Sequence, residues 1–115
     1  MLLVALILLA TAAVLGFVLL GYVLRGKPTP KALAFVHGPI AALGVLLVIV
    51  RAFVDGGMVW VAAALLALAA AGGIVLITSD LRGRGPSKAL SIAHGATAVA
   101  GFGLVLWLLV SSSPH

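Results

Sequence analysis

The chain has 115 residues and a formal net charge of +5, with 64% hydrophobic residues and only 8% charged residues. A soluble domain carries about 25% charged residues, so seven Lys or Arg and two Asp cannot cover a water-facing surface. The composition excludes most soluble folds and predicts an all-α integral membrane protein, with the lipid bilayer as its main surrounding. No polar face remains to bind nucleic acid, and the absence of cysteine excludes disulfides and thiolate metal sites.

Polar residues divide the chain into four apolar segments within a single membrane domain, residues 1–115. The expected spans are residues 2–24, 32–53, 58–78 and 89–110, each long enough for a transmembrane helix of about 20 residues. Glycine and proline residues separate the segments. Thr29 with Pro30, and Pro86 with Ser87, predict the starts of the second and fourth helices, because a hydroxyl can cap a first turn that favours proline.

Loop charge predicts the orientation of this four-helix bundle. Six of the seven basic residues lie in the first and third connections, namely Arg25, Lys27, Lys31, Arg82, Arg84 and Lys88. Because basic loops stay in the cytoplasm, both termini are expected outside a bacterial-type inner or plasma membrane. The second connection holds Arg51 and Asp55, which are expected to pair, whereas Asp80 is expected to pair with Arg82 or Arg84.

The sequence repeats itself at an offset of 57 residues. Between residues 24 and 48, 12 of 25 positions are identical to their partners, including Leu24-Arg25-Gly26 with Leu81-Arg82-Gly83 and His37-Gly38 with His94-Gly95. The matches predict two tandem two-helix hairpins, residues 1–57 and 58–115. Each unit has two spans, so the copies are expected to be related by a pseudo-twofold axis along the membrane normal.

Two histidines are the chemically informative residues of the apolar segments. His37 and His94 are repeat partners, and each follows a lysine, Lys31 or Lys88, by six residues, or about 9 Å along a helix. An ionisable side chain at this depth is costly unless it faces the bundle interior, so it indicates a functional site. The sequence contains no Glu, which removes carboxylate dyads and acidic proton relays.

Each histidine begins the same motif, H-G-x-x-A-x-x-G. The motif residues are Gly38, Ala41 and Gly44 in the first copy and Gly95, Ala98 and Gly101 in the second. Positions i, i+4 and i+7 share a helix face, so small residues beneath each imidazole leave room for a flat group. Neutral imidazoles bind haem iron axially from both sides. The pattern predicts one haem b per chain, ligated by His37 and His94, with Lys31 and Lys88 near its propionates.

In these His-Gly segments and in its four spans, the sequence resembles the transmembrane b-type cytochromes, which are four-helix bundles in which histidines from different helices bind haem. The resemblance implies one-electron transfer, and it favours an electron carrier or subunit over a stand-alone enzyme without excluding the latter. It also implies partners in the membrane, either a quinone or other electron-transport subunits, in a homo- or hetero-oligomer.

Other interpretations of the same residues remain. The small residues at spacings of four are also typical of close helix packing in lipid. The two histidines could form a mutual hydrogen bond or bind a divalent metal, although they supply only half of a tetrahedral site. The protein could then be a structural accessory subunit without a cofactor, or a small-solute transporter, which the lack of carboxylates disfavours.

Overall fold

The computed structural model describes residues 1–111, which form four helices and their connections. The helices are α1 (Leu2–Leu24), α2 (Lys31–Asp55), α3 (Met58–Leu81) and α4 (Lys88–Ser111). They begin and end within three residues of the predicted spans, and all four are long and apolar enough to cross a membrane. The expectation of an all-α fold that fits an integral membrane protein is therefore confirmed. The terminal His115 lies outside the described residues.

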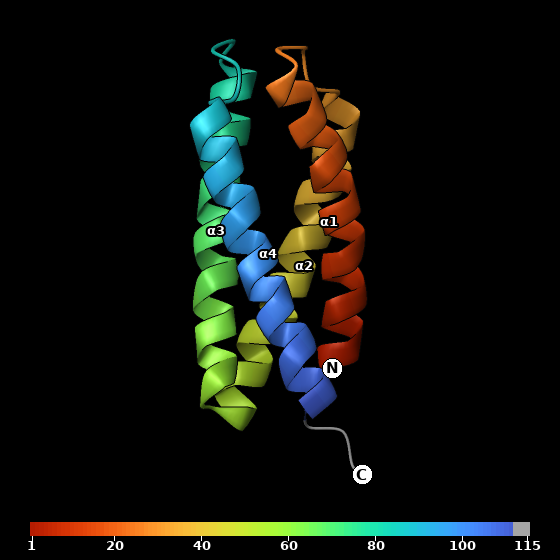
Figure 1. Ribbon diagram of the computed structural model, residues 1–115, viewed down its shortest axis with the longest axis vertical. Coiled ribbons are helices and arrows are strands. Elements are labelled where there is room, and N and C mark those ends of the chain that lie inside the picture. The colour runs from red at the N-terminus through yellow and green to blue at the C-terminus, as the bar shows by residue number, and fades with distance from the viewer. Residues whose placement is uncertain (112–115) are drawn as a thin grey trace.

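The helices form an elongated bundle of 49 × 21 × 21 Å in which each helix contacts two neighbours. Among the described residues, α1 packs on α2 and α4, and α3 packs on α2 and α4, with no backbone contact across either diagonal. Figure 1 shows α4 beside α3 at the end that carries the first and third connections, and beside α1 at the opposite end. The helices therefore exchange neighbours along the bundle.

The first and third connections begin with the same type of turn, and each turn depends on a glycine. Lys27 N–H donates to the Tyr22 carbonyl at 2.9 Å, and Arg84 N–H donates to the Ser79 carbonyl at 3.1 Å. This helix end requires a positive φ at one residue, which Gly26 (68°) and Gly83 (81°) adopt without a Cβ clash. The two turns lie at positions that differ by 57 residues. They bring all six predicted loop cations to one end of the bundle, which we call the basic end.

The starts of α2 and α4 differ. Leu90 N–H donates to Ser87 Oγ at 3.2 Å, so the predicted Ser87 cap is confirmed. The predicted Thr29 cap is wrong, because α2 has no side-chain cap bond and the Thr29 hydroxyl donates to an Asp80 carboxylate oxygen at 2.5 Å. Thr29 is buried and so needs a partner for its hydroxyl. A charged carboxylate is a stronger acceptor than the backbone.

The hydrophobic core lies away from the basic end. Its buried residues are Ala5, Leu9, Val45, Val48, Ala52, Val59, Ala62, Ala63, Leu66 and Val105, from all four helices. They belong to the first half of α1 and α3 and to the second half of α2 and α4. Large apolar side chains such as Val14, Leu68 and Ile74 remain 65% exposed on the outside, as expected for a surface that faces lipid.

Candidate functional site

The two predicted histidines meet inside the bundle although they belong to diagonally opposite helices. His37 on α2 and His94 on α4 have ring centroids 6.3 Å apart, with the ring planes at 83°. No backbone contact joins α2 to α4 among the described residues, so only side chains cross this diagonal. The structure thus brings together the residues that the repeat placed at equivalent depths.

Each imidazole is oriented by a backbone carbonyl of the other helix in its own hairpin. His37 Nδ1 donates to the Ala12 carbonyl of α1 at 2.8 Å, and His94 Nδ1 donates to the Ala69 carbonyl of α3 at 2.6 Å. A carbonyl only accepts, so Nδ1 carries the proton in both rings. In the neutral imidazole, Nε2 then has a free lone pair, which is the arrangement that histidine ligands of metals use.

Two glycines that the sequence analysis did not assign to the site make room for the rings. A Cβ atom added at Gly16 would lie 3.0 Å from His37 Cε1, and one added at Gly73 would lie 3.1 Å from His94 Cε1. The only sequence signal was the match of Gly16 with Gly73 in the repeat. The Ala12 and Ala69 carbonyls that accept these hydrogen bonds could not be predicted from sequence, because a backbone acceptor does not depend on the identity of the side chain.

The predicted small residues have different surroundings. An added Cβ at Gly38 or Gly95, next to each histidine, would meet nothing within 4 Å. At Gly44 it would lie 2.9 Å from Leu9 side-chain atoms, and at Gly101 2.8 Å from those of Leu66. Gly44 and Gly101 therefore allow close packing of α1 on α2 and of α3 on α4, away from the ring pair. Their partner positions Ala41 and Ala98 are both half-buried.

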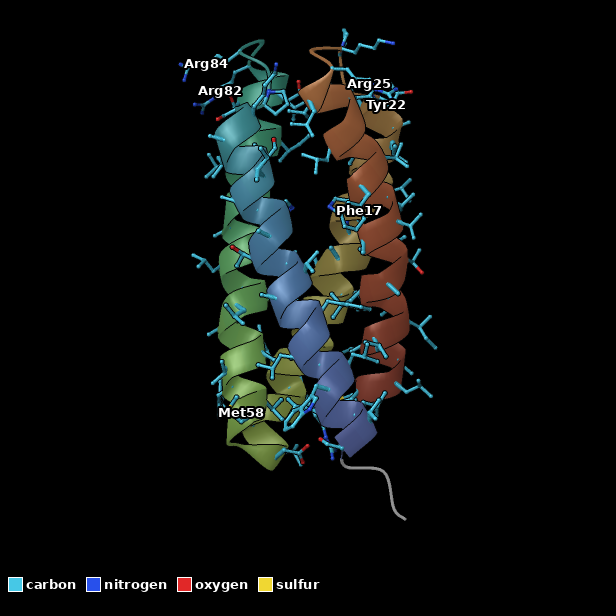
Figure 2. All side chains as sticks on the ribbon, in the orientation of Figure 1. Phe17, Tyr22, Arg25, Met58, Arg82 and Arg84 are labelled. Carbon is cyan, nitrogen blue, oxygen red and sulfur yellow. The ribbon has the colours of Figure 1, made fainter. Side chains whose placement is uncertain are left out.

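The two predicted lysines are also not equivalent. Lys31 Nζ lies 2.7 Å from an Asp80 carboxylate oxygen, and the Asp80 side chain is only 10% exposed. The prediction that Asp80 pairs with Arg82 or Arg84 is therefore wrong, because Lys31 reaches it from the start of α2. Lys88 is exposed at the start of α4 and forms no ion pair within residues 1–111. Figure 2 shows Arg25, Arg82 and Arg84 at this same end of the bundle, far from Met58.

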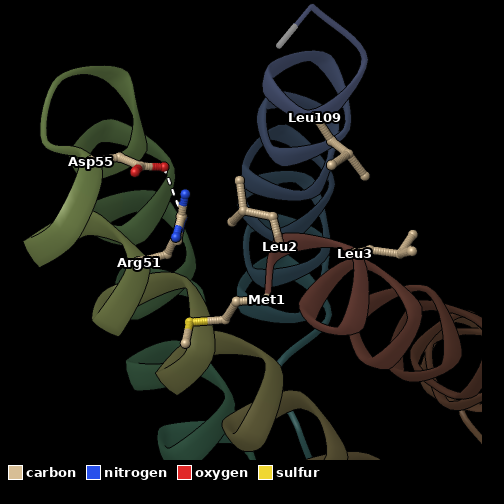
Figure 3. A pocket seen from close by; sticks show the side chains of 6 residues that line it. All are labelled: Met1, Leu2, Leu3, Arg51, Asp55 and Leu109. Atoms are coloured by element: carbon tan, nitrogen blue, oxygen red, sulfur yellow. Dashed lines mark hydrogen bonds and ion pairs between the residues drawn. The ribbon is translucent and has the colours of Figure 1, made fainter. Parts of the chain in front are cut away.

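One pocket lies at an end of the bundle and another on its side. One of about 410 Å³ lies at the end opposite the basic end, where the Arg51–Asp55 ion pair (2.8 Å) forms as predicted (Figure 3). Its other lining residues are Met1, Leu2, Leu3 and Leu109, so it offers little chemistry beyond a surface ion pair. The second, of about 570 Å³, is an apolar groove between α1 and α4 that includes Gly95, the residue after His94.

The geometry of the ring pair bears on two of the interpretations left open by the sequence. The 6.3 Å centroid separation and the 83° interplanar angle are typical of an edge-to-face ring contact, in which centroids lie about 4.5–7 Å apart. Within the described residues, no group of three His, Cys, Asp or Glu side chains could complete a site for a divalent ion. The described rings also do not hydrogen-bond to each other.

Comparison of the chain with protein-family models, with curated proteins and with solved structures revealed no significant match to any of them.

Proposed function

We propose that this protein binds one haem b between His37 and His94 and transfers single electrons within the membrane. The observation that supports the proposal most strongly is the pair of Nδ1–carbonyl hydrogen bonds, which leave both Nε2 atoms available across a 6.3 Å centroid separation. When bound, haem would supply a one-electron iron couple. If His37 and His94 both bound the iron, no position would remain for oxygen, so electron transfer would be favoured over oxygen activation.

The chain's own residues would hold and tune the cofactor. The Ala12 and Ala69 carbonyls keep each ring in one tautomer, and an acceptor on Nδ1 raises the basicity of the ligating nitrogen. Gly38 and Gly95 leave open helix surface beside the ligands. Lys88 forms no ion pair among residues 1–111 and could therefore bind a propionate, whereas the ammonium group of Lys31 is already paired with Asp80.

The proposal also includes the membrane in which the bundle lies, the orientation of the bundle and its electron partners. The four helices span a bacterial-type plasma membrane, with the basic end in the cytoplasm and both termini outside. The two hairpins are related by a pseudo-twofold axis along the membrane normal, which is supported by the recurrence of the same hydrogen bonds and glycine contacts at an offset of 57 residues. Because little of the chain lies outside the helices, the electron partners are a quinone or neighbouring membrane subunits.

An absorption spectrum tests the proposal directly. Protein produced in haem-replete cells and purified in detergent should show a Soret band that shifts on reduction, together with sharp α and β bands. Quantification should give one haem per chain. His37→Ala and His94→Ala should each abolish the spectrum of low-spin haem with two axial imidazoles, whereas His115→Ala, which removes the third histidine of the sequence, should retain it.

A structural accessory role is the second candidate, because the same hydrogen bonds tie α1 to α2 and α3 to α4. In that case the wild-type protein would be colourless even after incubation with haemin. His37→Ala would then lower the unfolding temperature and change nothing else. A colourless wild-type protein, or an unchanged haem spectrum in both histidine variants, rules out the haem proposal.

A further inference from the structure

The two contact lines that join the hairpins, the α1–α4 seam and the α2–α3 seam, differ at the basic end. Across the α2–α3 seam, Asp80 at the end of α3 accepts hydrogen bonds from Lys31 at 2.7 Å and from Thr29 at 2.5 Å. Lys31 also donates to the Thr29 carbonyl and hydroxyl, both at 3.2 Å. We call these three residues the Asp80 clamp. It joins the two hairpins at the basic end of the bundle.

The α1–α4 seam lacks the equivalent clamp because of two residue differences between the repeats. Lys88 is the partner of Lys31, but Val23 stands at the position that matches Asp80, and Pro86 at the position that matches Thr29. Val23 has no carboxylate to offer, and Lys88 is exposed without an ion pair in residues 1–111. The tandem repeat is therefore broken at this point, and only one of the two seams is held by charge.

The unclamped seam contains the apolar groove of about 570 Å³. Phe17 and Leu20 of α1 line one wall, and the other wall is formed by α4 residues, namely Ile92, Gly95, Ala96, Val99 and Ala100. In Figure 2, Phe17 lies on α1 between the centre of the bundle and the basic end. The groove has no charged lining residue and opens toward the side of the bundle that would face lipid. Gly95, which lines the groove, directly follows His94 in the sequence.

From these observations we infer that the α1–α4 seam is the lateral opening through which the bundle takes up haem from the bilayer, and that the groove holds an apolar edge of the porphyrin. The inference rests on the proposed haem site. A porphyrin is a flat apolar ring with its charges on one side, which matches an uncharged, apolar groove with cations at the adjacent end of the bundle. The Asp80 clamp keeps the opposite seam closed.

Haemin uptake by the haem-free protein in nanodiscs tests this inference with a matched pair of variants. Val99→Trp fills the groove, while Ala42→Trp places the same bulk at the repeat-equivalent position of α2, which is also exposed. We expect Val99→Trp to slow haemin uptake at least tenfold. The transfer of bound haem from this variant to apomyoglobin should also be at least tenfold slower. Ala42→Trp should stay within twofold of wild type. Equal effects in the two variants, or a larger effect of Ala42→Trp, overturn the inference.

A second measurement needs no bound haem. The chain has no cysteine, so spin labels attach only at introduced pairs: Leu20→Cys with Ile92→Cys across the α1–α4 seam, or the repeat-equivalent Ile77→Cys with Phe35→Cys across the α2–α3 seam. In the haem-free protein, we expect a broader distance distribution for the first pair, narrowed by haemin. Equal widths contradict the inference alone, whereas a wild-type protein that binds no haemin contradicts the proposed function.

Discussion

Gly16 of α1 lies against the imidazole of His37, so that a Cβ atom at residue 16 would come within 3.0 Å of Cε1. The same relationship joins Gly73 to His94 at 3.1 Å. Real Cβ atoms rarely approach a neighbour this closely, and each ring is also held by a carbonyl one turn earlier on the same helix as its glycine. The position of each imidazole is therefore set by backbone atoms and by the lack of a side chain.

Larger residues at these glycines should displace the imidazoles. We expect Gly16→Val and Gly73→Val to reduce haem occupancy at least tenfold, because a branched side chain cannot fit beside the ring while Nδ1 keeps its carbonyl partner. Haem titration followed by absorbance measures the effect. Gly21→Val is the control on α1, since an added Cβ there meets nothing within 4 Å and occupancy should stay at the wild-type level. Equal losses at residues 16 and 21 would contradict the assignment.

Replacing a closely packed glycine by alanine, away from the ring pair, should lower the stability of the helix bundle. In Gly101→Ala the new methyl group would lie 2.8 Å from Leu66 Cγ and Cδ2, and Leu66 is only 2% exposed and cannot move aside. Overpacking of this kind costs about 1–3 kcal/mol, which exceeds the helix-propensity gain of about 1 kcal/mol. We expect a net loss of about 1 kcal/mol in the free energy of unfolding, measured by SDS titration. Gly103→Ala, with open space around it, should lose nothing.

The two acidic residues of the sequence should differ in their contribution to stability. Asp80→Asn removes the charge that Lys31 and Thr29 share, in a side chain that is 10% exposed, so we expect a loss of about 1–3 kcal/mol. Asp55→Asn disrupts an exposed i,i+4 pair, which contributes about 0.3–0.5 kcal/mol. Thermal unfolding in detergent compares them. Equal losses for the two variants would show that the clamp contributes no more stability than an exposed ion pair.

The proposed orientation predicts which introduced cysteines react from outside. Pro28→Cys lies in the first connection at the basic end, and Ser111→Cys lies at the end of α4, next to the opposite face of the bundle. In intact cells we expect a membrane-impermeant maleimide to label Ser111→Cys and to label Pro28→Cys only after the cells are permeabilised. The unmodified chain, which has no cysteine, is the background control. The reverse labelling pattern would show that the protein has the opposite orientation in the membrane.

Helix bounds and the depth of the histidines could be predicted from sequence, because both follow from local properties. Apolar length sets the helices, and six residues of helix after Lys31 or Lys88 set the depth of each imidazole. The motif glycines could not be assigned by the same reasoning. Gly44 and Gly101 lie near the histidines in sequence, but their contacts are with leucines of the neighbouring helix. Helical spacing predicts a shared face and does not predict which partner that face meets.

By itself, the sequence determined the all-α fold, the four long apolar helices and the internal repeat, since these depend on composition and on spacing along one chain. Only the tertiary structure decided that Asp80 pairs with Lys31 and not with a neighbouring arginine, and that the Ala12 and Ala69 carbonyls hold the two rings. The physical reason is that backbone acceptors have no signature in a sequence. An ion pair across a seam depends on how the helices exchange neighbours along the bundle. No local sequence pattern predicts that exchange.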